Sequence, residues 1–384
     1  MGSEMTRVVV GEFITGDKNP KIIGAGEARS LGVRHGYVSN PDSATISVRN
    51  ALDLAEKSSG IKIKRAFVSV GGASLKSENS SGEAIISKAN GEVTTLDVNR
   101  ALADCEENLN LNNKKIIQMY PLSFRLDGKE VLGRPEGMRG TKLEAKALFV
   151  TYSVQHLDDL LEVIGRAGVE TIDVIPAPLA VANVVLSDRQ KIVGVAVVNI
   201  GSETTSLAVF ENGSLISVHT FAIGSSDITN DIALGFKIPL EKAEELKLQN
   251  LADSRVGAKE EFPKKKLEEI IRARLCDIFE SVENNLKKIK RVELLPAGII
   301  FAGGGANTHK LEESSKAVLK LPSLVGTTQI FGNLRTKLRD PAWFTAIGLL
   351  MSSLENGGYA ENSLMGVFKN VKNLLKASVR QLIP

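Results

Sequence analysis

The sequence carries one short segment twice, once in each half of the chain. Residues 2–12 read GSEMTRVVVGE and residues 201–211 read GSETTSLAVFE. Without a gap, the identical pairs are Gly2/Gly201, Ser3/Ser202, Glu4/Glu203, Thr6/Thr205, Val10/Val209 and Glu12/Glu211. Each copy is a Gly-Ser turn that runs into an apolar, β-branched stretch, which predicts a hairpin near the start of two related halves. Chance similarity over so short a segment is the alternative.

Turns of this kind carry exposed backbone N–H groups, and such groups together form a concavity that binds anions. If the two halves face each other, the two Gly-Ser turns meet at a shared cleft. The repeat therefore predicts a cleft that holds phosphate groups between two lobes.

Length and composition limit the number of domains and the classes of partner. A chain of 384 residues is too long for one ordinary core and predicts at least two domains. The apolar content of 43% is typical of soluble globular proteins, and a net charge of +3 is too small to favour nucleic acid as a partner. Cys105 and Cys276 lie far apart without metal-type spacing, which fits a reduced, cytosolic compartment. No apolar run is long enough to span a bilayer.

Hydrophobic periodicity predicts alternating strands and helices, and hence an α/β fold. Buried strands are expected at residues 8–10, 22–23, 66–70, 145–152, 193–200 and 297–302. Helices are expected at 44–55 after a cap at 40–43, at 157–164, and at 341–353 with Asp340 as its cap. Residues 79–82 and 108–113 are read as polar turns, and 237–292 as a charged, helix-rich block.

A second chemical signal is the glycine run Gly303, Gly304 and Gly305, directly after a predicted strand. Three glycines allow a ligand to lie against bare backbone. A tight strand-to-helix turn explains a lone run equally well. Its position after the second Gly-Ser turn is what favours a ligand site.

These segments together resemble the FtsA family of actin-like bacterial cell-division proteins over essentially the full chain. Residues 193–210 resemble the family's second phosphate loop, 298–311 its adenosine motif, and 174–183 with 344–350 the two helices that connect the halves. Residues 228–233 and 243–247 match segments beside the nucleotide. The block from about 73 to 168 resembles the subdomain inserted in this family, which other actin-like proteins lack.

The resemblance implies an actin-like, two-lobed α/β fold of the actin, Hsp70 and sugar-kinase type, with an inserted subdomain and a C-terminal amphipathic helix. Its implied domains are lobe 1 (1–72 and 169–190), the inserted subdomain (73–168), lobe 2 (191–236 and 293–355), a helical subdomain (237–292), a linker (356–363) and the terminal helix (364–384). It also implies ATP as the ligand. The expected nucleotide-binding residues are Gly2, Ser3, Gly201, Ser202, Glu203, Thr204, Gly224, Glu244, Lys247, Gly303, Gly304, Gly305 and Asn307.

The phosphate side departs from the family pattern. The chain begins at the first phosphate loop, so the strand and the acidic residue that precede this loop in the family are not in this sequence. The second loop has Asn199 and Ser206 where the family has carboxylates, and Glu203 adds a negative charge. Carboxylates hold the divalent cation in phosphoryl transfer. We therefore expect weak nucleotide binding, a doubtful Mg²⁺ site, no catalytic residue and little or no hydrolysis. The alternative is that the Glu203 side chain swings out to solvent and nucleotide still binds.

The C-terminus carries an apolar stripe at three- and four-residue spacing, flanked by basic residues and without an acid after Glu361. A basic amphipathic helix of this kind lies in an anionic membrane interface. Packing of the helix on its own domain is the alternative. The expected membrane-binding residues are Val367, Phe368, Lys369, Val371, Lys372, Leu374, Leu375, Lys376, Val379, Arg380 and Leu382.

The resemblance also implies partners. The helical block 237–292 would receive the C-terminal tail of FtsZ, with Arg274, Lys287, Lys288 and Arg291 as weak candidates. The chain would assemble with itself into protofilaments, and the inserted subdomain would contact other division proteins. The implied function is an adaptor that tethers FtsZ polymers to the cytoplasmic face of the membrane at the division site. The alternatives are a PilM-like pilus-assembly adaptor and an active actin-like ATPase.

Overall fold

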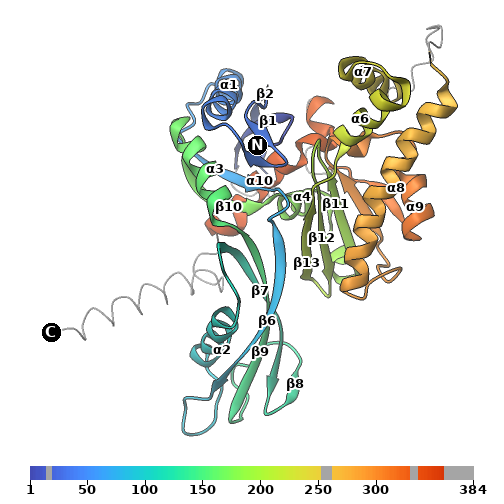
Figure 1. Ribbon diagram of the computed structural model, residues 1–384. Helices are drawn as coiled ribbons and strands as arrows, with labels where there is room; N and C mark the ends of the chain where they lie inside the picture. The colour runs from blue at the N-terminus through green and yellow to red at the C-terminus, as the bar shows by residue number, and fades with distance from the viewer. Residues whose placement is uncertain (14–19, 252–261, 329–335, 359–384) are drawn as a thin grey trace. The chain divides into compact units, whose positions relative to one another are not determined.

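The computed structural model describes residues 1–13, 20–251, 262–328 and 336–358. The chain divides into two compact units (Figure 1). The first unit comprises residues 1–78, 111–120 and 148–350, and the second comprises 79–110, 121–147 and, among the described residues, 351–358. The predicted terminal helix at 364–384 lies outside the described residues, as does the linker beyond residue 358.

The first lobe of the first unit contains two separate pairs of strands. Strand β1 (Met5–Glu12) is antiparallel to β2 (Lys21–Arg29), and β5 (Arg65–Val70) is parallel to β10 (Glu170–Pro176). A small hairpin of β3 (Val33–Arg34) and β4 (Tyr37–Val38) lies between them in the chain. No strand of the part of the chain described here pairs with both β1 and β5.

Helix α1 (Pro41–Ser59) begins at the predicted cap, where the Asn40 side chain accepts a hydrogen bond from the Ser43 N–H. It packs closely on β2 because β2 has glycine where the helix crosses. A Cβ atom on Gly26 would lie 2.2 Å from the Ala51 carbonyl oxygen. Helix α3 (Val154–Arg166) packs against α1 and β10.

The second lobe is built on five strands in the order β15-β14-β11-β12-β13, which belong to a nine-stranded sheet that continues through the pairing of His219 in β13 with Lys76 in β6 (Lys76–Ile85). The central strand β11 is antiparallel to β12 and parallel to β14. The strands are β11 (Val195–Ile200), β12 (Thr205–Glu211), β13 (Ser214–Phe221), β14 (Ile299–Ala302) and β15 (Ser323–Val325). Strand β11 begins two residues later than predicted for 193–200, because Val193 is the last residue of the short helix α5 (Asp188–Val193).

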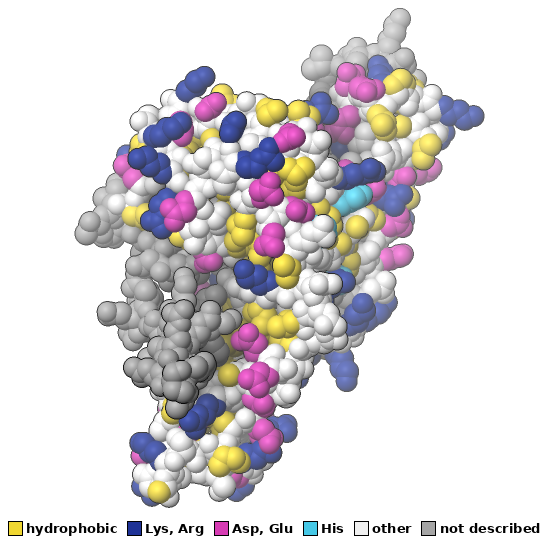
Figure 2. All heavy atoms as spheres, turned by 60° about the vertical axis from the view of Figure 1, so that its left-hand side comes forward, with side chains coloured by type: hydrophobic (Ala, Val, Ile, Leu, Met, Phe, Trp, Pro, Cys, Tyr) yellow, Lys and Arg dark blue, Asp and Glu magenta, His cyan; other side chains and the backbone are white. Residues whose placement is uncertain are grey.

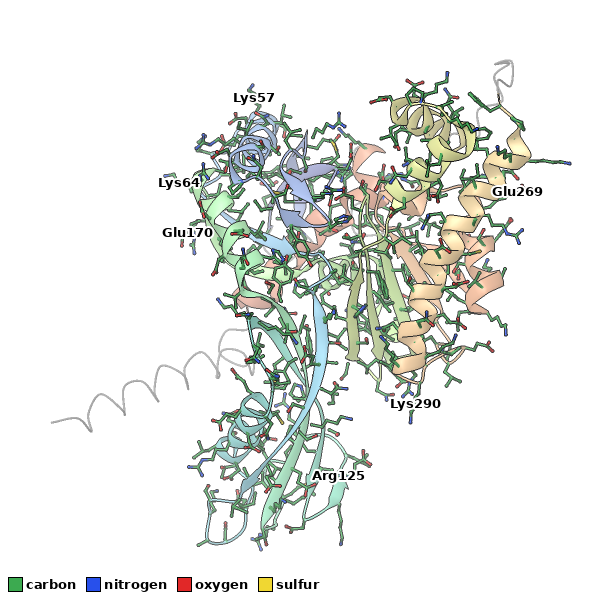
Figure 3. All side chains as sticks on the ribbon, viewed as in Figure 1. Lys57, Lys64, Arg125, Glu170, Glu269 and Lys290 are labelled. Carbon is green, nitrogen blue, oxygen red and sulfur yellow. The ribbon has the colours of Figure 1, made fainter. Side chains whose placement is uncertain are left out.

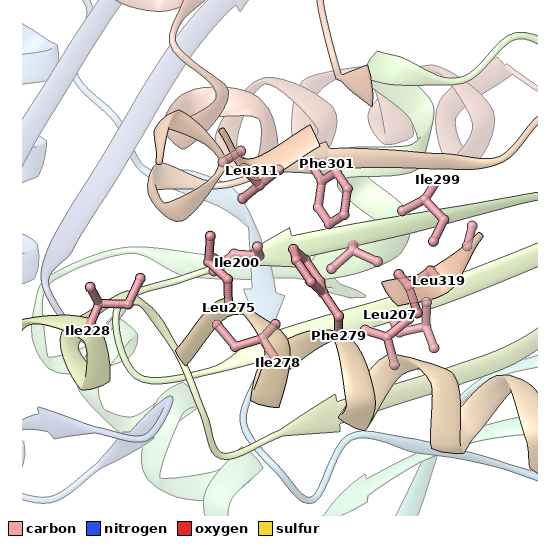
Figure 4. Packing of buried hydrophobic residues seen from close by; sticks show 14 of the residues in the cluster. Ile200, Leu207, Ile228, Leu275, Ile278, Phe279, Ile299, Phe301, Leu311 and Leu319 are labelled. Carbon is pink, nitrogen blue, oxygen red and sulfur yellow. The ribbon is translucent and has the colours of Figure 1, made fainter. Parts of the chain in front are cut away.

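One face of this sheet carries a hydrophobic core (Figure 4). Phe279 and Leu275 of helix α8 pack against Phe301, Leu207 and neighbouring strand residues, and all four are at most 1% exposed. Burying a side chain of this size contributes about 1.5 to 3 kcal/mol. The helices and turns of this lobe are α6 (Ser225–Phe236), α7 (Leu240–Leu251), α8 (Lys264–Lys288), α9 (Leu311–Leu319) and the 3₁₀ turns η1 (Gly304–Asn307) and η2 (Thr336–Arg339).

Two helices join the lobes, as the resemblance implied. Helix α4 (Ala177–Val185) contacts β5 and β10 of the first lobe and β11 and β12 of the second. Helix α10 (Phe344–Gly358) follows the 3₁₀ turn η3 (Pro341–Trp343), whose predicted cap Asp340 accepts from the Ala342 N–H. The two helices touch at Gly348, where a Cβ atom would lie 1.8 Å from the Ala180 carbonyl oxygen.

The second unit combines one helix with a small sheet in the order β6-β9-β7-β8. Its elements are β6 (Lys76–Ile85), α2 (Thr95–Glu107), β7 (Lys114–Leu126), β8 (Lys129–Val131) and β9 (Lys142–Ser153), of which β6, β7 and β9 begin or end in the first unit.

The prediction of a turn at 79–82 is wrong, because these residues lie within β6. Their polar residues suggested a turn, but Gly82 is buried, Ser80 is half-buried, and only Asn79 and Ser81 are exposed. A Cβ atom on Gly82 would meet the Cys105 backbone nitrogen of α2 at 2.3 Å, so glycine permits the helix to pack here. Cys105 itself is buried, and its thiol donates to the Ala145 carbonyl oxygen at 3.4 Å. Burial raises the pKa of this thiol to about 11.

Candidate functional site: a cleft between the two repeated turns

The first unit contains a cleft of about 890 Å³, lined by both copies of the repeated turn. Gly2 and Ser3 come from the first copy, and Gly201, Ser202 and Thr204 from the second. The two turns have the same geometry. The Gly2 N–H donates to the Met5 carbonyl oxygen at 3.1 Å, and the Gly201 N–H donates to the Thr204 carbonyl oxygen at 2.8 Å. The repeat in the sequence is therefore a repeat in the structure, and both copies face one cavity.

The second turn is held in place by the start of α6. The Ser225 N–H donates to the Gly201 carbonyl oxygen at 2.9 Å, and the Ser226 N–H to the Ser202 carbonyl oxygen at 2.8 Å. Gly224 permits this approach, since a Cβ atom there would lie 2.3 Å from the Ser202 oxygen. The turn is thus a fixed part of the cleft wall.

The glycine run forms another part of the wall. Gly303 has a φ of 82°, a value that favours glycine, and a Cβ atom on it would lie 2.3 Å from the Ile200 carbonyl oxygen. Gly305 is pressed equally closely against the Ile200 side chain, at 2.4 Å. The glycine run therefore packs on the end of β11 and presents its backbone to the cleft. The same three glycines form the tight turn after the strand and the part of the cleft wall without side chains.

A buried lysine joins α6 and α7 at the cleft. Lys247 is only 6% exposed, and its ammonium group donates to the Ser225 carbonyl oxygen at 3.2 Å and to Thr229 Oγ1 at 2.8 Å. It also pairs with Glu244 at 2.7 Å, and the Thr229 hydroxyl donates to the same carboxylate. A buried charge costs little when paired and fully hydrogen-bonded. Lys247 and Glu244 therefore act as one polar unit of the wall.

Three predicted residues do not line the cleft. The Glu203 carboxylate accepts a hydrogen bond from the backbone N–H of His35. Gly224 lies behind the second turn, and Asn307 donates to Asp340 at 3.1 Å. The structure thus brings together the other expected residues. Glu203 is not among the lining groups, and it is half-buried against the His35 backbone rather than turned out to solvent.

The first lobe contributes glycines of its own that the sequence pattern did not single out. Gly36, Gly71 and Gly72 of the first lobe line the cleft. The signal for Gly71 and Gly72 was present, since they follow a predicted buried strand just as Gly303 does. Asn199 and Ser206 line the cleft as well. The acidic lining residues are Glu4, Glu241, Glu244 and Glu245, and within the described ranges no group of three or more His, Cys, Asp or Glu is placed to hold a metal ion.

The candidate contacts for an acidic peptide are three residues of α8 and Arg291, which follows the labelled Lys290 just beyond the helix (Figure 3). Most of their charge is already paired. Arg274 makes two hydrogen bonds to Asp231, at 2.7 and 2.9 Å, and these raise its pKa. Arg291 pairs with Glu211 and Lys287 with Glu283. Lys288 lies in the last turn of the helix.

Charge on the remaining surface is mixed. On the face in Figure 2, basic and acidic side chains are interspersed over the described residues. No helix among those residues is both long enough and apolar enough to cross a membrane. The expected membrane-binding residues from Val367 to Leu382 lie outside the described part.

The fold is that of actin-like proteins. The chain superposes on a PilM–PilN type IV pilus biogenesis complex with a TM-score of 0.68, at 15% identity over 92% of this chain and 97% of that one. It superposes on the ethanolamine utilization protein EutJ from Carboxydothermus hydrogenoformans with a TM-score of 0.53, at 16% identity over 91% and 86% of the two chains. At such low identity these likenesses show the fold alone.

Sequence comparison shows the family. The profile of cell division protein FtsA matches residues 196–348, and that of the SHS2 domain inserted in FtsA matches residues 72–151. FtsA of Bacillus subtilis is 30% identical over 93% of this chain and 82% of its own length. FtsA of Pseudomonas aeruginosa is 29% identical over 92% and 88%. With its actin-like lobes, its inserted unit and its two matched turns, the chain belongs to the FtsA family of cell-division proteins.

Proposed function

We propose that this chain is a cell-division adaptor that tethers FtsZ polymers to the cytoplasmic face of the membrane and assembles with itself into protofilaments. Its family membership gives the cell-division role. The tether, the self-assembly and the division-site location extend that role by what the sequence resemblance implies. Binding and assembly, rather than turnover, are the work of the molecule in this proposal.

The lining of the cleft supports the proposal that the chain binds nucleotide but hydrolyses little or none of it. Asn199 is the last residue but one of β11, Ser206 pairs with it on β12, and both line the cavity. Neither side chain carries the negative charge that holds a divalent cation beside phosphates. Backbone turns and glycines remain, and these bind anions without catalysing transfer. We therefore propose weak ATP binding through the cleft and little or no hydrolysis, with the metal unneeded or loosely held.

Steady-state phosphate release tests this part directly. The wild-type chain is expected to release phosphate from Mg-ATP at the rate of the blank. A variant with Asn199→Asp and Ser206→Asp carries carboxylates at the two positions. Its rate of phosphate release is compared with that of the wild-type chain. Wild-type turnover at a rate typical of enzymes, abolished by Asn199→Ala, would establish the ATPase alternative instead.

The membrane part rests on the basic, amphipathic pattern of residues 364–384. Co-sedimentation with anionic vesicles tests it, using the full chain and a shortened chain that ends at Glu361, each with and without FtsZ polymers. We expect only the full chain to sediment and to carry FtsZ with it. If both chains stay in the supernatant, the terminal segment does not bind the membrane and the tether proposal fails.

The proposed binding of FtsZ needs its own control, because most of the candidate basic residues already form ion pairs within the chain. Lys288→Glu should weaken FtsZ capture in solution if the late part of α8 receives an acidic tail. Lys57→Glu, at the end of α1 in the other lobe, changes the charge equally and is expected to have no effect. Equal capture by both variants would place the contact elsewhere.

A PilM-like role is the second candidate, favoured by the superposition on PilM over nearly the full chain. The full-length sequence relatives cited above are all division proteins, so we rank it second. Depletion in the cell separates the two. Filamentous, undivided cells support the division adaptor, and normal division with loss of pili supports the pilus adaptor.

A further inference from the structure

Three neutral polar residues form a row across the sheet of the second lobe, and we call them the polar row. Asn199 of β11 pairs with Ser206 of β12, and Ser206 pairs with Thr220 of β13. Residues directly opposite each other on paired strands lie on the same face of a sheet. All three line the cleft. Asn199 Oδ1 lies 2.6 Å from the place where a Cβ atom on Gly303 would be, so the row adjoins the glycine run.

Thr220 has a buried hydroxyl without a partner. The residue is 2% exposed, and its Oγ1 makes no hydrogen bond to any described residue. Among the described side chains that have such a buried, unpaired atom, Thr220 is the one that lines the cleft. Buried polar groups are rarely left unpaired, because a buried hydroxyl without a hydrogen bond has lost its contact with water for nothing in return. A ligand in the cleft is therefore the expected partner of this hydroxyl.

Hydroxyls close to Thr220 in the sheet are satisfied within the chain. Thr205 Oγ1, next to the polar row on β12, donates to the Ile223 carbonyl oxygen at 2.8 Å. Ser217 Oγ, three residues before Thr220 and on the opposite face of β13, donates to Asn285 Oδ1 at 3.2 Å. The unpaired hydroxyl is thus a feature of the strand face that lines the cleft.

The chemistry of the polar row does not fit a divalent cation. Mg²⁺ beside phosphates is held by carboxylates or through waters that carboxylates bind, and the row offers two hydroxyls and one amide. The acidic residues of the lining lie on the first turn and on α7 instead. Two of them are paired, Glu4 with Arg29 and Glu244 with Lys247. Hydroxyl and amide groups can donate hydrogen bonds, which phosphate oxygens accept. The row therefore fits an anion.

The same lining also supplies positive charge for an anion. In the first copy of the repeat, Arg7 occupies the position that Ser206 occupies in the second, and it too lines the cleft. The Arg7 guanidinium pairs with Glu27 at 3.3 Å, and Glu27 also pairs with Lys337. Because two cations share one carboxylate, the charge of Arg7 is only partly neutralised. Arginine is well suited to phosphate groups.

Resting on the nucleotide cleft proposed above, we propose that the polar row is a phosphate subsite that works without a metal ion. The Thr220 hydroxyl donates directly to a phosphate oxygen, and the Ser206 hydroxyl and the Asn199 amide are the neighbouring donors. A hydrogen bond to an ionised acceptor is stronger than a neutral one, and this bond satisfies the hydroxyl that the chain leaves unpaired. The cleft therefore binds a nucleotide through phosphate oxygens that carry no Mg²⁺.

Calorimetric titration of the full chain with ATP tests the independence from metal. The affinity in EDTA should be at least as high as that in excess Mg²⁺, since a bound cation occupies oxygens that the polar row would contact. Binding that is about tenfold tighter with Mg²⁺ than in EDTA would overturn the inference.

Thr220→Val keeps the shape of the side chain and removes only the hydroxyl. It should weaken ATP binding about tenfold, the loss of one hydrogen bond to a charged group, and leave adenosine binding unchanged. Its thermal transition should not fall, because no hydrogen bond within the chain is lost. Ser217→Ala is the matched control, since it removes a paired hydroxyl from the other face of the same strand. It should lower the thermal transition and leave ATP binding unchanged. Unchanged ATP binding by Thr220→Val, or an equal loss for adenosine, contradicts the subsite.

Inorganic phosphate separates a free phosphate from the phosphates of a nucleotide. A rise in the wild-type thermal transition with phosphate, abolished by Thr220→Val, shows that the polar row also takes free phosphate. Weakened ATP binding by Thr220→Val without such a rise limits the subsite to nucleotides. If neither ATP nor adenosine binds the wild-type chain, the nucleotide cleft fails. The phosphate response then decides alone, and its absence removes the subsite as well.

Discussion

The two lobes begin with the same turn but surround it differently. In the second lobe, β12 follows the turn into the interior of a continuous sheet, and Leu207, Ala208 and Val209 are all fully buried. In the first lobe, β1 follows an equivalent turn, but its residues Val8 to Val10 are only half-buried and pair with β2 alone. Turn geometry is thus set locally by the Gly-Ser segment, whereas burial is set by the neighbours that a strand acquires.

The first lobe compensates with a helix. Register places Gly26 opposite Val8 in the first lobe, and His219 opposite Leu207 in the second. Glycine permits α1 to lie directly on its strand, and the second lobe has a bulky imidazole at the matching place. The first lobe therefore has a close helix–strand contact at the register position where the second lobe has the His219 side chain.

Breaking that contact should have the largest effect. Gly26→Ala puts a methyl group 2.2 Å from one backbone atom of α1 and 2.5 Å from another, so the helix has to move. We expect a loss of about 3 kcal/mol in unfolding free energy, measured by urea titration. His219→Ala, at the matching place, should cost about 1 kcal/mol or less. Equal losses at the two positions would show that α1 does not support the first lobe in this way.

Val10 and Val209 are identical residues at matching positions of the repeat, so the same substitution at each shows how burial alone changes the loss of stability. Val209→Ala removes two methyl groups from a fully buried site and should cost about 2 to 3 kcal/mol. Val10→Ala removes the same groups from a half-buried site and should cost about 1 kcal/mol. A reversed order would contradict the difference in burial between the two sheets.

The histidine should give the second lobe a pH dependence. Burial, and then the charges of Lys76 and Lys288, lower the pKa of His219 to about 4. The unfolded chain binds the proton near pH 6.5, so stability falls as pH decreases from 6.5 towards 4. Because His219 is partly exposed, we expect a loss of only about 1 kcal/mol. Thermal unfolding of His219→Gln and of the wild-type chain across this pH range isolates the contribution of His219 to stability. Parallel pH profiles of the two proteins would contradict this contribution.

The identical pair Glu12 and Glu211 should show the smallest difference. Glu211 holds Arg291 through three hydrogen bonds of 2.7 to 3.0 Å, and Glu12 meets the exposed Lys21 at 3.2 Å. Glu211→Gln is expected to cost about 1 kcal/mol and Glu12→Gln at most about 0.3 kcal/mol. Chemical denaturation in low salt measures both, and indistinguishable values would mean that the better geometry adds no stability.

Much of the fold was predictable from local patterns. The repeat located both turns, and the caps at Asn40 and Asp340 located two helix starts, because these signals depend on a few neighbouring residues. The β6 strand was missed because its polar residues are tolerated on an exposed strand face. Periodicity cannot reveal that a helix distant in the sequence covers Gly82.

The candidate site was predictable in its residues but not in its side-chain directions. The glycines and the Glu244–Lys247 pair were found because their types and spacing match a known pattern. The direction of Glu203 depends on a hairpin tip far away in the sequence, and no local signal encodes that meeting. Gly71 and Gly72 could have been found by applying to the first lobe the reasoning used for Gly303.

The two cysteines give the molecule a built-in reporter. Cys105 is buried in the second unit, and its raised pKa keeps it as an unreactive thiol at neutral pH. Cys276 lies on α8 of the first unit and is only partly buried. A thiol reagent therefore labels Cys276 early and Cys105 only when the second unit opens. The rate of labelling at Cys105 would time the opening of the inserted unit, with Cys276 as the internal standard for a thiol that reacts in the folded chain, and without any substitution in the chain.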